Sequence, residues 1–378
     1  MSQKIQDVNT QYVADSRLYA SKLVVTVPIW KGKLQLGSEY SNIERTSLYM
    51  IEAVSDDLPS NSDDKIKESN VSAFTSYMMN FGKSQLDAGL RYEYVVSDYY
   101  NKNVYMSEQS KSYSNFFPYI AFSFPLKNTA VNLNYNVKAR RPSYNMLSGN
   151  VQYNDKYTYQ GGNPLTQPAY LHTIAMNASY RWLRFYTSWR YTKNAFYQCV
   201  EPYEKNAEIT VYTYRNHPHY QSMNLGMTLS PKVGGWQPML DLSIMKNYFS
   251  IGNVKYNKPF FFVTFNNSFQ LPYGIVANVD MDYVTKGHST TIEWAETGGL
   301  NLSLYKSFFN DKLSINLQGR DLFASCRGSN TMRYANREIY QWKYSDTRKL
   351  ILTVRYRINP SCNKYKGTGA GQEQKSRM

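Results

Sequence analysis

Residues 130–140 read Ala-Val-Asn-Leu-Asn-Tyr-Asn-Val-Lys-Ala-Arg, and apolar and polar side chains alternate along almost all of this stretch. Val131, Leu133 and Tyr135 share one face of an extended strand, because successive side chains of a strand point to opposite faces. Asparagine and lysine side chains occupy the other face. The apolar face would pack in a core if the protein were a soluble sandwich, and it would contact lipid in a transmembrane barrel.

The same alternation recurs in four other segments, at residues 85–96, 275–283, 312–320 and 349–358. At roughly 10 to 14 residues, these segments match the ~9–11 residues of a tilted membrane strand better than the ~5–6 residues of an average globular strand. The length of the segments therefore favours the barrel over the sandwich. No helical pattern separates the strands, which excludes a fold built of alternating strands and helices.

Short turns alternate with long connections along the chain. Short turns are predicted at 28–32, 82–84, 126–128, 182–183, 231–236, 272–274 and 308–312, and long connections at 46–68, 98–112, 142–168 and 327–346. Outer-membrane barrels have short periplasmic turns and long extracellular loops. The sequence therefore predicts an all-β fold, an antiparallel transmembrane β-barrel with about 14 strands in this chain.

Composition agrees with a barrel. Aromatic residues make up 16% of the chain, including 36 tyrosines, as expected where aromatic girdles line both membrane interfaces. The mean hydropathy of −0.57 does not exclude the bilayer, because only alternate residues of a membrane strand need to be apolar. The aromatic residues predicted to lie at one interface, in or beside the short turns, are Trp30, Phe81, Trp182, Trp236, Tyr273, Phe308 and Phe309.

Charge and motif content argue against several other functions. The net charge is +15, but the basic residues are scattered through the strands, so binding of nucleic acid is not expected. The three cysteines fit no metal or redox motif, and His217 and His219 form a pair without a supporting ligand cluster. No arrangement of catalytic side chains can be nominated. We therefore expect neither enzyme activity, nor a metal site, nor a cofactor.

The chain divides into three parts. Residues 1–15 form a polar lead-in, residues 16–358 form the barrel region, and residues 359–378 form a polar, flexible tail. The first residues lack the apolar segment of a secretory signal. A barrel of the Gram-negative outer membrane must be exported, so we expect the export signal, and the N-terminal part of a larger protein, to lie upstream.

Two motifs bracket the connection at 142–168. They are Arg140-Arg141-Pro142-Ser143-Tyr144 and Gly162-Asn163-Pro164-Leu165-Thr166-Gln167-Pro168-Ala169. They resemble motifs of the TonB-dependent receptor barrels of Bacteroidetes, in which an Arg-Pro-Ser-Tyr-like strand end is followed by a long loop and a Gly-Asn-Pro-x-Leu-x-Pro-Glu-like motif. The second motif departs from that pattern, because it lacks one spacer residue and has Ala169 where the acid is usual.

The C-terminal region extends the resemblance. Residues 319–323, Gly-Arg-Asp-Leu-Phe, resemble an Asn-Asp-Leu-Phe-Asn segment near the end of such barrels, and residues 349–358 resemble their last strand. The tail at 365–371 is similar to tails in the same family, so that the resemblance covers about residues 16–378. It implies a receptor-type barrel with an N-terminal plug and a TonB-contacting segment. Neither is recognisable here, so this chain is expected to be the C-terminal part of a larger receptor-type barrel that lacks its plug.

The function implied by the resemblance is uptake of a scarce nutrient. The implied partners are outer-membrane lipid, a TonB-type energy-coupling protein acting through the missing N-terminal region, and a surface lipoprotein. Two alternatives stay open: a non-transporting surface protein, either an adhesin or a structural barrel, and a soluble β-rich binding module. A plug encoded upstream would favour the transporter, and absence from the membrane fraction would favour the soluble module.

The longest loop and its neighbourhood supply the candidate ligand residues. Aromatic rings there could stack on flat ligands, although packing between loops is the alternative role. The arginines could hold an anionic solute or lipid phosphates, but pairing with acidic plug residues is the favoured role. The candidates are Tyr144, Tyr153, Tyr157, Tyr159, Arg140, Arg141 and Arg190.

Overall fold

The structure is a computed structural model, and it describes residues 8–52, 58–326, 328–334, 336–358 and 369–378. The long strands are β1 (Asn9–Ile29), β2 (Gly32–Glu52), β3 (Ser62–Phe81), β4 (Ser84–Asn101), β6 (Lys111–Leu126), β7 (Thr129–Arg140), β10 (Ala169–Tyr180), β11 (Leu183–Pro202), β12 (Thr210–Leu229), β13 (Trp236–Tyr248), β16 (Phe260–Leu271), β17 (Ile275–Val284), β20 (Thr297–Phe308), β21 (Leu313–Arg320) and β24 (Lys349–Tyr356).

Shorter elements lie in the connections. They are β5 (Val104–Tyr105), β8 (Val151–Asp155), β9 (Thr158–Gly161), β14 (Ser250–Ile251), β15 (Val254–Lys255), β18 (Gly287–Ser289), β19 (Ile292–Trp294), β22 (Gly328–Tyr334), β23 (Arg337–Lys343), the helices α1 (Tyr144–Leu147) and α2 (Gln372–Arg377), and the 3-10 turn η1 (Pro272–Gly274). No helix in the described part of the chain is long and apolar enough to cross a bilayer.

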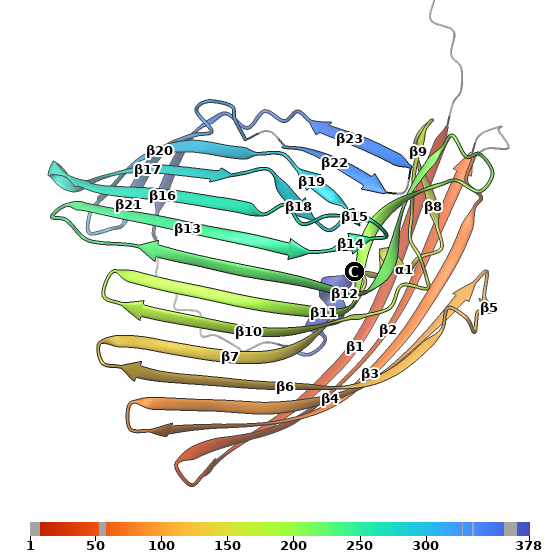
Figure 1. Ribbon diagram of the computed structural model, residues 1–378, viewed down its shortest axis with the longest axis horizontal. Coiled ribbons are helices and arrows are strands. Elements are labelled where there is room, and N and C mark those ends of the chain that lie inside the picture. Colours follow the sequence, from red (N-terminus) through yellow and green to blue (C-terminus); the bar gives the residue numbers. More distant parts are fainter. Residues whose placement is uncertain (1–7, 53–57, 327, 335, 359–368) are drawn as a thin grey trace, which may run out of the picture.

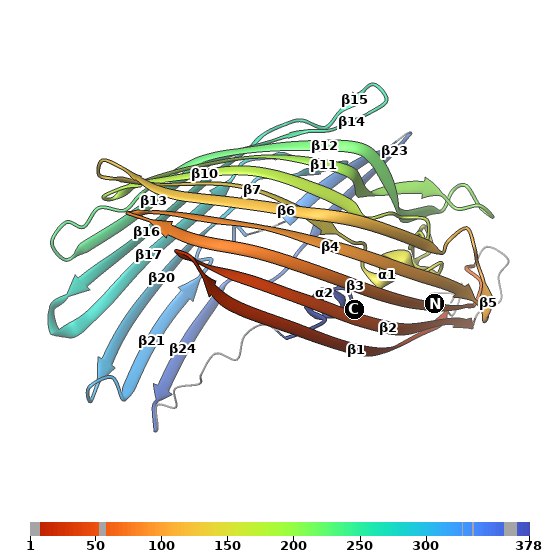
Figure 2. The same cartoon turned by 90° about the horizontal axis from the view of Figure 1, so that it is seen from below.

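Each long strand pairs antiparallel with the next one along the chain, from β1 to β24. Of the 18 strands assigned to this sheet, β5, β8 and β9 are short additions, which leaves 15 in the meander against about 14 expected. The sheet curves strongly, and both helices lie on its concave side (Figures 1 and 2). Within the described residues β1 and β24 do not pair with each other, so the wall is an open arc.

The predicted alternation is confirmed in space. Leu133 is aligned with Met176 on β10, and Tyr135 with Ile174, so these four side chains share the convex face. Leu133 and Ile174 are 41% and 53% exposed there, which suits side chains that meet lipid. Asn134, one position on, points to the concave side and lines a cavity of about 560 Å³. The period of two thus separates an apolar outer face from a polar inner face.

All the short turns lie where the sequence predicts them, at one end of the sheet, here called the turn end (Figure 1). Several are two-residue turns that need left-handed backbone, with φ of 54° at Trp30, 63° at Gly82, 54° at Lys127 and 49° at Arg181. Such turns match the right-handed twist of the flanking strands. The opposite end, here called the loop end, carries the long connections, including the sheet β18-β19-β22-β23.

We expect the loop end to be extracellular and the turn end periplasmic. A cysteine at Lys156, in the connection at 142–168, should react with a membrane-impermeant maleimide on intact cells that carry the full-length protein. A cysteine at Lys232, in the turn at 231–236, should react only after the outer membrane is opened. Both side chains are exposed. The parent chain controls for its native cysteines, and labelling at position 232 alone would reverse the topology.

Strand lengths near the N-terminus differ from expectation. β1 and β2 each contain 21 residues and β3 contains 20, against the roughly 10 to 14 expected for a strand that ends with the bilayer. β1 begins at Asn9, so the boundary predicted at residue 16 is wrong. At the loop end the outer face is polar, with Glu44 and Lys65 in an ion pair of 2.8 Å. Apolar and polar side chains no longer alternate there, although the backbone pairing continues. The strands are therefore longer than the alternation in the sequence indicates.

The C-terminal residues differ as well. Residues 372–377 form α2, and Arg377 is buried, so the last ten residues are not the flexible tail that was expected. Polar composition misled the prediction, because the partners of these residues are charged groups on the inner wall. Residues 359–368, which include part of the family-like tail at 365–371, lie outside the described residues.

Candidate functional site: charged groups on the inner wall

Three carboxylates stand on the inner face of neighbouring strands. Glu39 on β2 and Glu93 on β4 both oppose Ser72 of β3, so all three side chains project to the same side. Glu68, also on β3, lies four residues away on that side and is 2% exposed. The sheet register therefore gathers acidic groups that are far apart in sequence. We call Glu39, Glu68 and Glu93 the acidic row.

Arginines neutralise the acidic row. Arg91 contacts Glu39 at 3.3 Å and Glu93 at 2.5 Å. Arg141, just beyond β7, contacts Glu93 at 2.6 Å. A buried charge is tolerated only when it is paired and hydrogen-bonded, so this alternation of signs is what allows the cluster to exist inside the arc.

The C-terminal helix supplies further partners. Glu373 contacts the second terminal nitrogen of Arg141 at 2.6 Å. Arg377 holds Glu68 through two bonds of 2.5 and 3.0 Å and donates from Nε to the Pro142 carbonyl at 3.0 Å. Residues 309 positions apart in the sequence are thereby joined.

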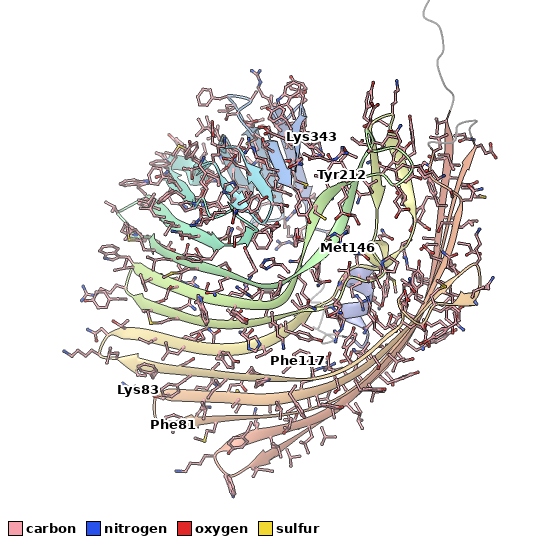
Figure 3. All side chains as sticks on the ribbon, turned by 45° about the vertical axis from the view of Figure 1, so that its right-hand side comes forward. Phe81, Lys83, Phe117, Met146, Tyr212 and Lys343 are labelled. Atoms are coloured by element: carbon pink, nitrogen blue, oxygen red, sulfur yellow. The ribbon has the colours of Figure 1, made fainter. Side chains whose placement is uncertain are left out.

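The connection at 142–168 folds back onto the same wall. Ser143 caps α1 by accepting from the Met146 N–H at 3.3 Å. Asp64 of β3 accepts from the Ser148 hydroxyl at 2.7 Å and from the Gly149 N–H at 2.9 Å. Side chains on the inner wall therefore hold the loop inside the curve of the sheet, and Figure 3 shows Met146 on the concave side.

The cluster fixes the protonation of its members. Burial opposes the positive charge of Arg377, but the Glu68 carboxylate outweighs that effect and raises the pKa of Arg377 above its ordinary value. Burial, and then the negative charge of Glu68, raises the pKa of Tyr144 as well. Tyr144 is therefore a neutral phenol that donates its O–H to Glu68 at 3.2 Å. The Glu68 side chain thus lies between the guanidinium of Arg377 and the phenol of Tyr144.

The predicted ligand residues do not form one site. Arg141 and Tyr144 belong to the charged cluster, and both are buried. Arg190 is exposed on the inner wall, where its Nε lies 3.4 Å from Thr173. Arg140 lies over the Phe196 ring at 4.5 Å.

The tyrosines of the loop lie together at the loop end. The rings of Tyr153 and Tyr159 are 5.6 Å apart, and Tyr159 meets Tyr203 edge-on at 5.0 Å. Tyr159 is 2% exposed, so its ring packs between loops. Tyr157 is 61% exposed, with Lys156 over its ring at 5.3 Å. Of the four predicted tyrosines, Tyr157 presents most of its surface to solvent.

Sequence reasoning missed most of the charged cluster. The alternation along residues 85–96 predicted Arg91 and Glu93 on the polar face of the strand, but it did not identify the residues that pair with them. Glu68 and Arg377 gave no signal, because neither lies in a motif. The alternation of side chains on β2, β3 and β4 would have placed the three carboxylates of the acidic row on one face of the sheet. Nothing in the polar C-terminal sequence indicates that Arg377 is buried.

The aromatic residues predicted for one membrane interface lie at the turn end. Trp30, Tyr273 and Phe309 are 94%, 88% and 72% exposed. The remaining predicted members, whose exposure is lower, are Phe81, Trp182, Trp236 and Phe308. All of them occupy the turns or the adjoining strand ends, the position that an interfacial girdle requires.

A second aromatic row, which the sequence reasoning did not single out, crosses the convex face. The Tyr135 hydroxyl and His172 Nδ1 are 3.0 Å apart, and the His172 ring lies 6.2 Å from that of Tyr191. Tyr191 stacks on His219 at 6.3 Å. Tyr191 lies nine residues beyond Trp182, and at ~3.3 Å per residue and a tilt of ~40° the two are roughly 23 Å apart along the membrane normal. That distance matches the ~25 Å apolar band of a membrane barrel.

The sheet at the loop end contains another buried charge. Glu293 of β19 contacts Lys258 at 3.1 Å, Lys286 at 3.2 Å and Arg333 at 2.9 Å. Burial acts to raise the pKa of Glu293, but the hydrogen bonds from these three cations outweigh it and lower the pKa to about 2. Glu293 therefore ties β19 to β22 and to the preceding loops as a carboxylate.

A carboxylate whose pKa is lowered by folding stabilises the fold above its unfolded pKa of ~4.3, and this stabilisation is lost as the pH falls through the folded pKa. We therefore expect amide protection in β22 and β23 to fall between about pH 4.3 and pH 2. Hydrogen exchange, corrected for intrinsic rates, measures this. Glu293→Gln should abolish the pH dependence, and equal pH dependence in both proteins would contradict the assignment.

The chain is similar to known proteins of the outer membrane. The model of the outer membrane protein beta-barrel family matches residues 2–356. A search of curated proteins found no match. Among solved structures, the copper transporter OprC aligns with a TM-score of 0.65 at 14% identity, over 92% of this chain and 57% of that chain.

Two further solved structures share the fold. The ferric preacinetobactin receptor BauA from Acinetobacter baumannii aligns with a TM-score of 0.58 at 12% identity, over 92% of this chain and 55% of that chain. The unliganded ferric citrate transporter FecA aligns with a TM-score of 0.58 at 9% identity, over 94% and 56%. This chain therefore spans just over half the length of these proteins, and at such identities the likeness concerns the fold alone.

Proposed function

Because this chain belongs to the outer membrane protein beta-barrel family, we propose that it forms much of the wall of a receptor-type transporter that takes up a scarce nutrient. The protein is an antiparallel β-barrel protein of the cell outer membrane. Its fold likeness to receptor barrels supports the proposal.

The observation that carries the proposal is the width of the wall together with its polar inner face. The 15 strands of the meander already form an open arc within the described residues. Barrels of about eight strands are filled by their own side chains, whereas barrels of about 16 to 22 strands enclose a channel or a plugged interior. A polar inner face suits a path for solutes, because it replaces part of their hydration.

We propose that the plug, and the segment that contacts a TonB-type protein, are not among these 378 residues. The solved receptors are longer than this chain, because the part that aligns with it makes up 55–57% of each of them. Further strands would also pair β1 and β24, whose free edges are unfavourable in lipid because unpaired backbone groups there find no water. A surface lipoprotein remains a proposed partner at the loop end.

Among the predicted ligand residues, the proposal assigns first contact with solute to Arg190 and Tyr157. Arg190 is exposed on the inner wall, and Tyr157 is exposed at the loop end. Arg141 and Tyr144 are already saturated by contacts within the protein. We therefore assign them to the structure of the interior.

The test is uptake by cells. A strain that lacks the gene, the parent strain and a complemented strain are offered labelled copper, ferric chelates and other scarce nutrients, each with and without a protonophore. We expect one compound to enter the parent and complemented strains only, and to stop entering when the protonophore is added. Equal uptake of every compound by all three strains would contradict the transport function.

One observation favours a surface protein as the second candidate. At the loop end, Trp294, Tyr340 and Trp342 are 42%, 64% and 60% exposed on the sheet β18-β19-β22-β23. Exposed aromatic rings are typical of binding surfaces. Loss of cell adhesion on deletion of the gene, with nutrient uptake unchanged, would support this candidate over the transporter.

A further inference from the structure

The last ten described residues, 369–378, lie inside the arc of the wall. Gly371 adopts a left-handed conformation with φ of 70° and donates its N–H to Glu39 at 3.0 Å. The helix α2 that follows has Gln374 and Arg377 buried against the inner wall. A cavity of about 360 Å³ remains beside it, lined by Lys22, Ser41 and Arg91 among others. The segment therefore narrows the interior.

One residue makes most of the attachment. Arg377 meets both oxygens of Glu68, donates to the Pro142 carbonyl, and lies 4.3 Å from the centre of the Tyr144 ring. Three donors of one planar cation are thus used, and its face is stacked on an aromatic ring. Lysine could not reproduce this arrangement, because its ammonium lacks the planar fork and the stacking face.

The receiving site belongs to the wall and to the loop that is fastened to it. Glu68 is on β3, and Tyr144 begins α1; both are almost fully buried. Without Arg377, Glu68 would keep the Tyr144 hydroxyl as its donor and lose its counter-charge. A buried carboxylate without a counter-charge is unfavourable, so binding of a guanidinium group would stabilise it.

The character of the attachment suggests that it is reversible. Apart from Arg377, the segment is held by the Glu373–Arg141 pair and the Gly371–Glu39 bond, and Glu373 is partly exposed. Apart from glycines, the apolar residues of the segment are Ala370 and Met378, and neither is buried. A terminus that served only to fill a core would bury apolar side chains instead.

We propose that the segment 369–378 is a tethered blocker of the barrel interior, retained by a guanidinium-binding site made of Glu68, the Tyr144 ring and the Pro142 carbonyl. The ligand of this site is an arginine-bearing peptide segment, namely residues 369–378 of this chain with Arg377. The inference goes beyond nutrient uptake and does not depend on which solute is carried.

Peptide binding tests the site. The probe is the labelled peptide GAGQEQKSRM, which corresponds to 369–378, and anisotropy is measured with the full-length protein in lipid nanodiscs. The wild-type chain should bind it weakly, because its own segment competes at an effective concentration in the millimolar range. The Arg377→Ala chain should bind it at least tenfold more tightly. Equal binding by the two chains would overturn the proposal.

Peptides that differ from the native one at a single residue test whether the site recognises the guanidinium group of Arg377. The peptide that carries Arg377→Lys should bind the Arg377→Ala chain at least tenfold more weakly than the native peptide. The peptide with Lys375→Ala should bind as well as the native one, because Lys375 is exposed. Adding Glu68→Gln to the chain should remove binding. Binding that ignores these changes would show non-specific attraction and overturn the site.

The reactivity of cysteines placed on the inner wall tests whether the segment 369–378 blocks the interior. Ser41 is buried beside α2, whereas Lys22 lines the same cavity and is exposed. A cysteine at Ser41 should react with a water-soluble maleimide at least tenfold faster in the Arg377→Ala chain than in the wild-type background. A cysteine at Lys22 should react equally in both. An unchanged rate at position 41 would show that the segment does not occlude the interior.

Discussion

Replacing Glu93 with glutamine is expected to destabilise the barrel by about 3–5 kcal/mol, because it removes one partner of a buried ion pair. Glu93 holds Arg141 at 2.6 Å, and only 3% of the Arg141 side chain is exposed. Of the carboxylates that contact this guanidinium among the described residues, the change leaves Glu373. Unfolding by urea from lipid vesicles measures the loss.

Two controls accompany Glu93→Gln. The double variant Glu93→Gln/Arg141→Met should be more stable than Glu93→Gln alone, because it removes the buried guanidinium that has lost Glu93, and the Glu373 side chain that then loses its partner is partly exposed. Glu44→Gln makes the same change in a partly exposed pair with Lys65 and should cost about 0–1 kcal/mol. Equal losses for Glu93→Gln and Glu44→Gln would mean that the acidic row is solvated rather than buried.

Replacing Leu133 with arginine is expected to cost about 2–4 kcal/mol of the free energy of folding into lipid, provided that residue 133 lies near the bilayer midplane. Leu133 is on the convex face, in line with Met176. Asn134→Arg should be tolerated, because Asn134 lines a cavity on the concave side. The two variants are compared by the same urea titration in vesicles. Equal losses would show that the two faces were wrongly assigned.

The parts of the fold that follow local rules could be predicted from the sequence. Leu133 and Asn134 were assigned to their faces by period alone. The turns at 82–84 and 272–274 were located by glycine and proline, which favour the backbone conformations needed there. These features depend on neighbours within a few residues, so that one sequence is enough to find them.

The rest depends on contacts between distant segments. The loop-end halves of β2 and β3 are polar on their outer face, so no alternation marked them as strands. Arg377 looked like part of a solvated tail, because its partner Glu68 is 309 positions away. Arg141 was expected to pair with acidic residues of the plug, whereas it pairs with Glu93 of the wall and with Glu373 of α2. Its need for a carboxylate could be inferred, whereas the identity of that carboxylate could not.

The central claim is that this sheet is a membrane wall with lipid on its convex side and a polar interior on its concave side. Spin labels placed singly at positions 131 to 136 in vesicles test it most directly, through the collision rates of each label with oxygen and with a water-soluble nickel chelate. We expect period two: labels at 131, 133 and 135 should favour oxygen, and labels at 132, 134 and 136 should favour the chelate. A uniform response along the strand, or the opposite phase, would contradict the claim.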